Sequence, residues 1–440
     1  MRQFRAILVD SFHESVARKS LLVVLVLALL LILFVAGISF ETEKLESVLE
    51  KQAGQLGLFS RGGGFFNWFA VNVSCKPSDI KPVAQSEGWN ADLAGGYAVT
   101  VTFKDQKEIE ELVRKWRSYK ARREAREQGR PFQEPPANEP VTPEQQRECL
   151  EARFTEVGYG HVQARRVAEA PPAFRVAVRT DYPHELCGAS RIKLLYGAIN
   201  TPLLQRSVAE MVVFIELRMA NVFGGFIGVL VAIMACSGFV PSMLQKGTLD
   251  LVLARPIGRG RLLLFKYVGG LWFVFILATV LIGGCWLAIT VRTGYANPWF
   301  LATIVTITAV FGVIYSVSVL IGILTRSGTL AALLSIFVWG TSEVLIAIRH
   351  GLRTMYMGQA VPAWLQNTLE VLYGIAPKTG DLIALNTHFL SRSHLSEAAY
   401  QRTFAGQVPK IEWAWSLGTT AAFTAAMLLL AIWFFRRKDY

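Results

Sequence analysis

The chain has 440 residues, 52% of them hydrophobic, with 45 Lys and Arg against 33 Asp and Glu. Residues 41–207 contain 24 basic and 22 acidic side chains, whereas the other 273 positions contain 21 basic and 11 acidic ones. Most of the net charge of +12 therefore lies in the most apolar part of the chain. This excludes a single soluble domain, a disordered protein and a nucleic-acid binder, whose basic residues would cluster on a solvated face. The pattern predicts a membrane protein with one large hydrophilic insert.

Six apolar runs are long enough to cross a membrane as helices, since a span needs about 20 largely apolar residues. In chain order they are Leu21–Phe40, Val222–Pro241, Val268–Thr290, Trp299–Leu324, Gly328–Ile348 and Trp413–Phe435. The predicted fold is a polytopic α-helical membrane protein with six transmembrane helices and an α+β extracytoplasmic domain between the first and second spans. The first run is longer than the apolar region of a signal peptide and no clear small-x-small site follows it, so we expect it to be retained.

Basic residues in the short loops predict the orientation. One side of the membrane collects Arg2, Arg5, Arg18, Lys19, Lys246, Arg255, Arg259, Arg261, Lys266, Arg326, Arg436, Arg437 and Lys438. Such a density favours the cytoplasmic side, which predicts a multi-pass protein of the cell (inner) membrane with both termini in the cytoplasm. The predicted divisions are an elbow helix with the first span (1–40), the extracytoplasmic domain (41–207) and a five-helix region (208–440). This last region contains a cytoplasmic loop at 244–266 and an outer loop at 349–412.

The insert has local signals for strands and helices. Tyr97–Phe103 alternates as a half-buried strand does. A helix should follow, because apolar residues recur at helical spacing at Ile109, Leu112, Val113, Trp116 and Tyr119. Beyond this stripe, the charged run ARREAREQGR is expected to lie in solvent.

The second half of the insert begins with the signature of a helix N-terminus. Thr142 is an expected N-cap with Gln145 as its capping-box partner, and Pro143 fits the first turn. Two strands are expected at His161–Ala168 and Phe174–Thr180, and a helical approach to the second span near Pro202.

The cysteines and the absent motifs predict no catalytic residue and no metal site. Of the five cysteines, Cys236 and Cys285 fall in spans and are expected to pack there. The remaining three, Cys75, Cys149 and Cys187, can form at most one pair within the chain, and the sequence does not select it. His184 and Cys187 have no second pair of ligands beside them. Phosphate-loop, HExxH and GxSxG motifs are absent.

Three charged residues near span ends are candidates for a transport pathway. Glu216 and Arg218 precede the second run, and Glu343 lies near the end of the fifth. They are close enough to the interface for their charged ends to reach water, which would make them interfacial anchors. Alternatively they line the mouth of a pathway.

The cytoplasmic link between the second and third runs has the sequence LQKGTLDLVLARPIGRGRLLLFK, from Leu244 to Lys266. Its leucines and valine at 249–253 predict a short apolar helix that the pair Arg255-Pro256 ends. A short amphipathic helix on this face can dock in a groove of a soluble partner or anchor the link to lipid headgroups.

This link resembles the permease subunits of type-2 ABC transporters, which carry a Lys/Arg-Gly-Thr-Leu run, an Arg-Pro pair and basic residues entering the third span. The matching residues are Lys246, Gly247, Thr248, Leu249, Arg255, Pro256, Arg259 and Lys266. The segment FRAILVDSFHESVARKS before the first span is similar to the elbow helix of that family. Ala376-Pro377-Lys378 and Asp381-Leu382 are similar to its short gating helices. The resemblance covers residues 1–40 and about 208–440, and leaves out 41–207.

The resemblance implies the permease subunit of an ATP-driven transporter, with an exporter as the expected direction. Two permeases, as a homodimer or pseudo-dimer, would pair with an ABC ATPase on a separate chain. ATP and Mg are expected on that ATPase, with no cofactor on this chain, which is not expected to be an enzyme by itself. The implied ATPase-coupling residues are Lys246, Gly247, Thr248, Leu249, Leu251, Arg255, Pro256 and Arg259.

Membrane lipid and an extracytoplasmic protein are further expected partners, and nucleic acid is not. The alternative function is a membrane-anchored scaffold or enzyme whose extracytoplasmic domain acts on an envelope partner. A secondary transporter is a third interpretation, but the internal repeat expected of one is not visible in the sequence.

Overall fold

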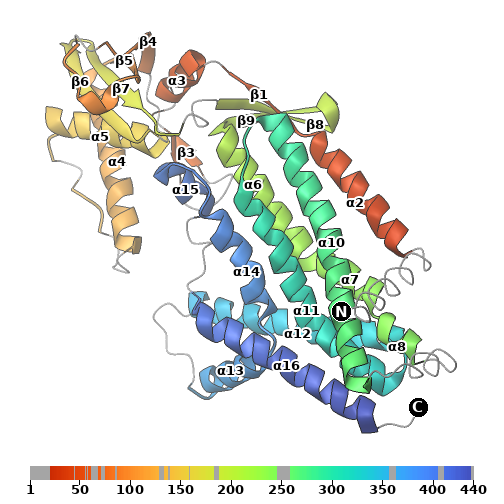
Figure 1. Cartoon of the computed structure of the whole chain (residues 1–440). Helices are drawn as coiled ribbons and strands as arrows, with labels where there is room; N and C mark the ends of the chain where they lie inside the picture. Colours follow the sequence, from red (N-terminus) through yellow and green to blue (C-terminus); the bar gives the residue numbers. More distant parts are fainter. Residues whose placement is uncertain are drawn as a thin grey trace. The chain divides into compact units, whose positions relative to one another are not determined.

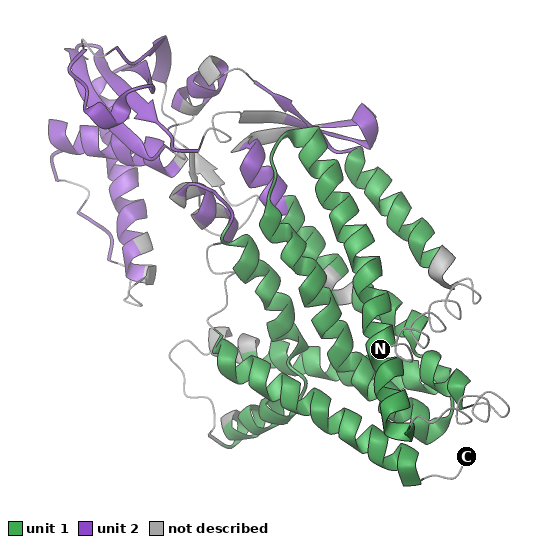
Figure 2. Cartoon of the chain, viewed as in Figure 1, with its two compact units in different colours: residues 1–36, 215–392, 408–440 green, residues 37–214, 393–407 purple. Residues whose placement is uncertain are grey.

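The computed structural model divides into two units (Figure 2). We call residues 1–36, 215–392 and 408–440 the transmembrane unit, and residues 37–214 and 393–407 the α+β unit. The structure describes residues 20–43, 45–54, 56, 58–60, 68–70, 75–84, 87–127, 133–136, 139–157, 159–182, 188–244, 258–355, 363–404 and 411–437.

The transmembrane unit is helical in the part that is described (Figure 1). Its first elements are α2 (Ser20–Ala36), α6 (Val208–Asn221, which begins in the α+β unit), the π-helical turn η5 (Val222–Ile227), α7 (Gly228–Cys236) and α8 (Phe239–Met243). They are followed by α10 (Arg259–Thr293), the short 3-10 helix η6 (Pro298–Leu301), α11 (Ala302–Thr325), α12 (Gly328–Met355), α13 (Ala363–Ile375), α14 (Thr379–Leu390) and α16 (Trp413–Arg437).

Four of the described helices are long and apolar enough to cross a membrane: Arg259–Thr293, Pro298–Thr325, Gly328–Arg349 and Trp413–Arg437. They contain the third to sixth predicted spans. The first two apolar runs form shorter described helices, Val23–Ala36 and Gly228–Met243, so the count of six spans stays a prediction. In the second run the sequence VFGGFI forms the π-helical turn, and π turns are frequent at functional sites in helices.

Helix α11 lies at the centre of the transmembrane unit. It packs against α7, α10, α12, α14 and α16. In its most apolar stretch 67% of residues are buried, whereas the corresponding value for α16 is 11%. Glycines such as Gly312 of α11 and Gly270 of α10 allow this burial, because small residues let neighbouring helices approach closely in a membrane.

Glycines on α10 and α11 form reciprocal contacts with tyrosines on the facing helix. The position of a Cβ on Gly270 lies 2.5 Å from Cε1 of Tyr315, and that of a Cβ on Gly312 lies 3.3 Å from Oη of Tyr267. The Tyr267 hydroxyl donates a hydrogen bond to the Gly312 carbonyl at 2.9 Å. The two tyrosine rings stack with their centroids 5.5 Å apart. Each glycine therefore provides the space that the tyrosine of the other helix fills.

In its described residues, the α+β unit contains three sheets and several helices. Its strands are β1 (Ser39–Thr42), β2 (Leu58–Ser60), β3 (Trp68–Ala70), β4 (Cys75–Pro82), β5 (Tyr97–Phe103), β6 (His161–Glu169), β7 (Pro172–Arg179), β8 (Gly188–Leu194) and β9 (Ile199–Ser207). Its helices, besides the start of α6, are α3 (Leu45–Gly54), η2 (Ala91–Leu93), α4 (Gln106–Glu127), α5 (Pro143–Val157), η4 (Leu195–Gly197) and α15 (Glu397–Phe404).

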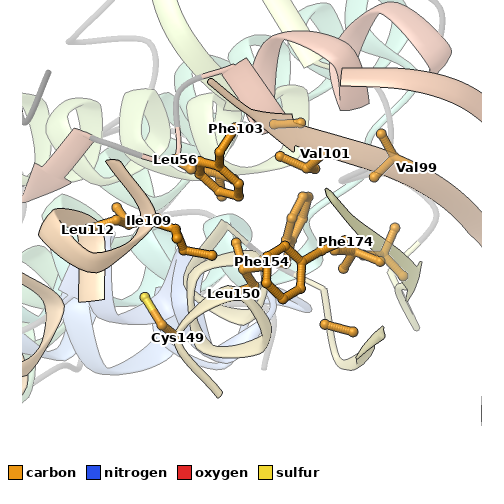
Figure 3. Close-up of a cluster of buried hydrophobic side chains, with 14 of the residues drawn as sticks. Leu56, Val99, Val101, Phe103, Ile109, Leu112, Cys149, Leu150, Phe154 and Phe174 are labelled. Carbon is orange, nitrogen blue, oxygen red and sulfur yellow. The ribbon is translucent and has the colours of Figure 1, made fainter. Parts of the chain in front are cut away.

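The largest sheet has the strand order β4-β5-β7-β6 and is antiparallel throughout. Its register places Val99 opposite Val176 and Val101 opposite Phe174, and these side chains share one face. That face packs against α3, α4 and α5 in one apolar core (Figure 3). The opposite face carries a smaller cluster of Leu93, Ala98 and Ala177.

The local signals of the insert correctly predicted strand β5 and helices α4 and α5. Strand β5 has the predicted bounds, and the predicted apolar stripe of α4 lies in the core except for the partly buried Tyr119. Helix α5 begins with the predicted capping box. The Gln145 backbone donates to Oγ1 of Thr142 at 3.3 Å, and the Thr142 backbone donates to Oε1 of Gln145 at 3.0 Å.

The predicted helix near Pro202 is wrong. Residues 199–207 form β9, which pairs with β8, and the helix begins only at Val208. Pro202 lies opposite Arg191 beside an irregularity in the register, where the missing backbone N–H of proline is tolerated.

Cys75 and Cys149 are free thiols in the structure, so they do not pair with each other. Burial raises the pKa of Cys75 to about 11 and that of Cys149 to about 12. Neither thiol is therefore ionised to a useful extent near neutral pH. Cys187, like the His184 beside it, lies outside the described residues.

An arginine on the open face of the large sheet bridges two carboxylates. Arg175 donates from Nη1 to Asp79 Oδ2 at 2.7 Å and from Nη2 to Glu87 Oε1 at 3.1 Å. The pKa of Asp79 is lowered by hydrogen bonds from Lys81 and then Arg175. The pKa of Glu87 is lowered chiefly by the hydrogen bond from Trp89. Desolvation opposes this effect, and the charge and hydrogen bond of Arg175 lower the pKa further.

Helix α15 comes from the segment between α14 and α16, yet it belongs to the α+β unit. It packs against α5, with Ala399 and Phe404 almost fully buried. The α+β unit is thus assembled from two stretches of chain, 37–214 and 393–407. The chain passes between the two units at residues 36/37, 214/215, 392/393 and 407/408.

Candidate functional site

Charged and hydroxyl side chains gather at the beginning of α14, among residues of α12, α13 and α16. These helices contact one another in the transmembrane unit. We call this the polar cluster and define it by Glu343, Arg349, Glu370, Tyr373, Lys378, Thr379, Asp381, Ser416 and Thr419. Ionisable residues buried among apolar helices are costly and mark functional sites in membrane proteins.

Asp381 lies in the first turn of α14, where a negative charge is favoured by the helix dipole. Its side chain is only 3% exposed. Oδ2 accepts a hydrogen bond from the hydroxyl of Ser416 at 2.6 Å and another from the hydroxyl of Tyr373. The carboxylate therefore ties α14 to α13 and α16 through neutral donors.

Lys378 directly precedes α14 and is 0% exposed. Its ammonium donates to Oγ1 of Thr419 at 2.7 Å. It also lies over two rings, 4.6 Å from the centroid of Tyr373 and 5.2 Å from that of Trp415. No ion pair of Lys378 is found among the described residues, so this buried cation is held by one hydroxyl and by cation–π contacts.

Glu343 of α12 contacts the first residue of α14. Oγ1 of Thr379 donates to Oε1 of Glu343 at 2.8 Å. The adjacent Gly380 lets α12 and α14 approach, because a Cβ there would lie 3.2 Å from Oε2 of Glu343 and 3.0 Å from Ile346. The predicted pathway residue Glu343 is thus brought into the polar cluster.

The polar cluster also contains an ion pair, between Arg349 and Glu370. Arg349 donates from Nε and Nη2 to the two carboxylate oxygens of Glu370, both at 3.1 Å. Its guanidinium lies 4.0 Å from the centroid of the Tyr373 ring. Bidentate pairing of this kind fixes the orientation of α13 against α12.

The cluster holds Lys378 and Asp381 one helical turn apart, yet their charges do not pair directly. Each is stabilised by hydroxyls of α16, Thr419 for the lysine and Ser416 for the aspartate. A shift of α16 relative to α14 would therefore remove both hydrogen bonds at once. Asp381 would then keep only the hydroxyl of Tyr373, and Lys378 would have no hydroxyl partner. Such an arrangement suits a switch between two packings, because intermediate positions are penalised.

Glu216 and Asn297 form a second buried polar contact. Nδ2 of Asn297 donates to Oε2 of Glu216 at 2.6 Å, and the Asn297 carbonyl accepts from Nε1 of Trp286 at 3.0 Å. Glu216 is 1% exposed, so the expectation that its charged end reaches water is wrong. Its Oε1 has no hydrogen-bond partner among the described residues. Arg218, two positions along the same helix, is exposed.

Most predicted coupling residues lie outside the described residues. This holds for Lys246, Gly247, Thr248, Leu249, Leu251, Arg255 and Pro256, and for the elbow segment before Ser20. Arg259 is described and is the first residue of α10. The next residue, Gly260, lies against the last turns of α16, since a Cβ there would be 3.1 Å from both Ile432 and Arg436. The link therefore leads directly into a close contact between α10 and α16.

The sequence placed Lys378 and Asp381 in segments similar to gating helices but did not assign them to a site, although it contained a further signal. A lysine and an aspartate three positions apart, in a short stretch between apolar runs, fall on one side of a helix start. What the sequence could not show is that their partners come from α13 and α16. Among the described residues no group of three potential metal ligands occurs.

Comparison with known protein families shows which family the chain matches. The family described as "ABC-2 family transporter protein" matches residues 6–440, which is nearly the whole chain and includes the α+β unit. A search of curated proteins finds no match.

Proposed function

The chain belongs to the ABC-2 family of transporter proteins and is a multi-pass membrane permease subunit of an ABC transporter; we propose that it is an exporter driven by a separate ATPase chain. ATP and Mg would bind to that ATPase. Two permeases, as a homodimer or a pseudo-dimer, would complete the transporter in the cell (inner) membrane, with both termini in the cytoplasm. The direction of transport rests on the resemblance of the link and elbow to type-2 permeases.

The observation that supports coupling through residues 244–256 is the position of α10. This helix begins at Arg259, directly after the link, and its start packs against the end of α16. Helix α10 also packs closely against α11 through the glycine–tyrosine contacts. A displacement of the link would therefore move a helix pair that packs against α14 and α16.

A nucleotide on the ATPase can shift the permease only through contacts that differ between its two states. We propose that Lys246, Gly247, Thr248, Leu249, Leu251, Arg255, Pro256 and Arg259 provide the contacts with the ATPase. The polar cluster would then be the responding element, since its hydrogen bonds depend on the relative position of α14 and α16. Glu343 would take part in the pathway through this cluster, whereas Glu216 and Arg218 would act near its mouth.

The α+β unit is proposed to lie outside the cytoplasm and to bind a partner or cargo in the envelope. Helix α15 of this unit lies in the chain between α14 and α16 of the transmembrane unit. This covalent connection to two helices of the polar cluster supports a role of the α+β unit in transport. The alternative, a membrane-anchored scaffold that acts through this unit, uses the same partner surface but needs no ATPase.

Co-expression with an ABC ATPase tests the proposal. Purified complexes of the unaltered chain should contain the ATPase and hydrolyse ATP, with stimulation by a transported substrate. Replacing Leu249 and Leu251 by Asp should abolish the association, since charged side chains cannot dock in an apolar groove. The matched control replaces both by Met, which keeps the apolar character and should retain the complex. Full association and stimulation in the Asp variant would overturn coupling through the link.

A further inference from the structure

An exposed arginine lies on a group of aromatic rings where two apolar helices begin. The rings belong to Trp299 at the start of η6, His388 and Phe389 in the last turn of α14, and Trp413 at the start of α16. We call these four rings the aromatic shelf. Arg392 follows α14, and its guanidinium lies 5.5 Å from the centroid of the Trp299 ring.

The shelf is built from interlocking ring contacts. Trp299 stacks on Phe389 with centroids 6.4 Å apart and planes 6° from parallel. His388 lies against Trp413 at 5.4 Å. Trp299 and Trp413 each stand at the beginning of an apolar helix long enough to cross a membrane. Tryptophans at span ends prefer the headgroup region of a bilayer, so the shelf marks that depth.

The charge of Arg392 is not neutralised by the described part of the chain. Its hydrogen bond goes to a neutral acceptor, Nε2 of His388, at 3.3 Å from Nη2. No ion pair of Arg392 is formed with a described residue. The guanidinium is itself exposed, so its remaining donors can reach a ligand.

We propose that Arg392 and the aromatic shelf bind the phosphate of an anionic phospholipid headgroup. A guanidinium presents planar, paired donors that match phosphate oxygens, and it is less strongly hydrated than an ammonium. The rings place this cation at headgroup depth and give the acyl chains an apolar wall. A soluble phosphate would gain only the first of these contributions. The bound lipid would fix the end of α14 to the starts of η6 and α16.

The test uses the full-length protein in detergent micelles and counts bound lipid by native mass spectrometry. Phosphatidylglycerol should bind more tightly than phosphatidylcholine. Arg392→Gln should weaken the binding of phosphatidylglycerol about five-fold, the usual effect of one basic residue near an anionic lipid surface. Trp299→Leu should weaken it as well, although the cation remains.

Arg292→Gln is the matched control, because it removes one positive charge from the last turn of α10 and replaces none of the residues of the shelf. Its preference for phosphatidylglycerol should equal that of the unaltered protein. The proposal is overturned if Arg392→Gln binds phosphatidylglycerol as tightly as this control, or if phosphatidylcholine binds equally well. It is also overturned if inorganic phosphate in excess displaces the lipid, since the site would then serve a soluble anion.

Discussion

Replacing Gly270 by Ala should disturb the contact between α10 and α11 by a predictable amount. The new Cβ would lie 2.5 Å from Cε1, 2.9 Å from Cζ and 3.0 Å from Oη of Tyr315. Carbon atoms in contact are normally about 3.5–4.0 Å apart, so the ring would need to move by about 1 Å. It is held in place between Tyr267 and Phe311, whose rings have centroids 5.5 Å and 4.9 Å from its own.

The expected cost is the overpacking penalty, about 1–3 kcal/mol. Alanine gains about 1 kcal/mol over glycine in a helix interior, which offsets part of this penalty. The same helix offers a control, because a Cβ on Gly283 would have no atom within 4 Å. Gly283→Ala should therefore show the gain alone. The difference in free energy of unfolding between the two variants isolates the overpacking term of about 1–3 kcal/mol.

Reversible unfolding in mixed micelles with increasing dodecyl sulfate measures this difference for the helical part of the chain. Gly284→Ala is an intermediate case, since its Cβ would lie 2.5 Å from the flexible end of Ile32 on the peripheral α2. The expected order of stability is Gly283→Ala, then Gly284→Ala, then Gly270→Ala. Equal stability of the first and last variants, within about 0.5 kcal/mol, would refute the close nesting of α10 and α11.

Three further perturbations test the buried polar contacts and the sheet. Lys378→Met keeps the length of the side chain but removes an unpaired buried charge, so the free energy of unfolding should stay the same or rise while transport falls; undiminished transport would remove the polar cluster from the mechanism. Asn297→Ala takes the hydrogen-bond donor from buried Glu216 and should cost about 1–3 kcal/mol, whereas Glu216→Gln in the same background should recover part of this loss. Arg175→Gln should lower stability at pH 7 but not in acid. The pKa values of its two carboxylate partners are lowered on folding, so their contribution is present above about pH 4 and is lost as the pH falls through the folded-state values. A stability difference from the unaltered chain that persists unchanged well below pH 4 would contradict this account.

The cost of keeping Lys378 and Asp381 buried argues for function. Hydrophobic side chains of similar size would pack there with less desolvation, and a buried charge is weak evidence for stability. Each charged group forms one hydrogen bond with a hydroxyl of α16, and this helix also packs against the start of α10 at its other end. Helix α16 therefore contacts both the start of α10 and the polar cluster.

Local patterns in the sequence predicted the elements but not their partners. Apolar length predicted the four long helices, and alternation predicted β5. The pair of Thr142 and Gln145 predicted the start of α5. These signals are local, because each depends on residues within a few turns or within one strand. The sequence failed at Pro202, where pairing with β8 overrode the expected helix.

The sequence by itself indicated a membrane permease with an α+β insert. Hydropathy, charge distribution and the link motif each depend on residues that are close together in the sequence. Only the tertiary structure decided that α15 belongs to the α+β unit, that Glu216 is buried, and that Lys378 and Asp381 share partners on α16. Ser416 and Thr419 lie more than thirty residues from the charges they stabilise. Contacts at such separation depend on how helices pack, and helix packing follows from the shapes of many side chains at once rather than from any periodic pattern.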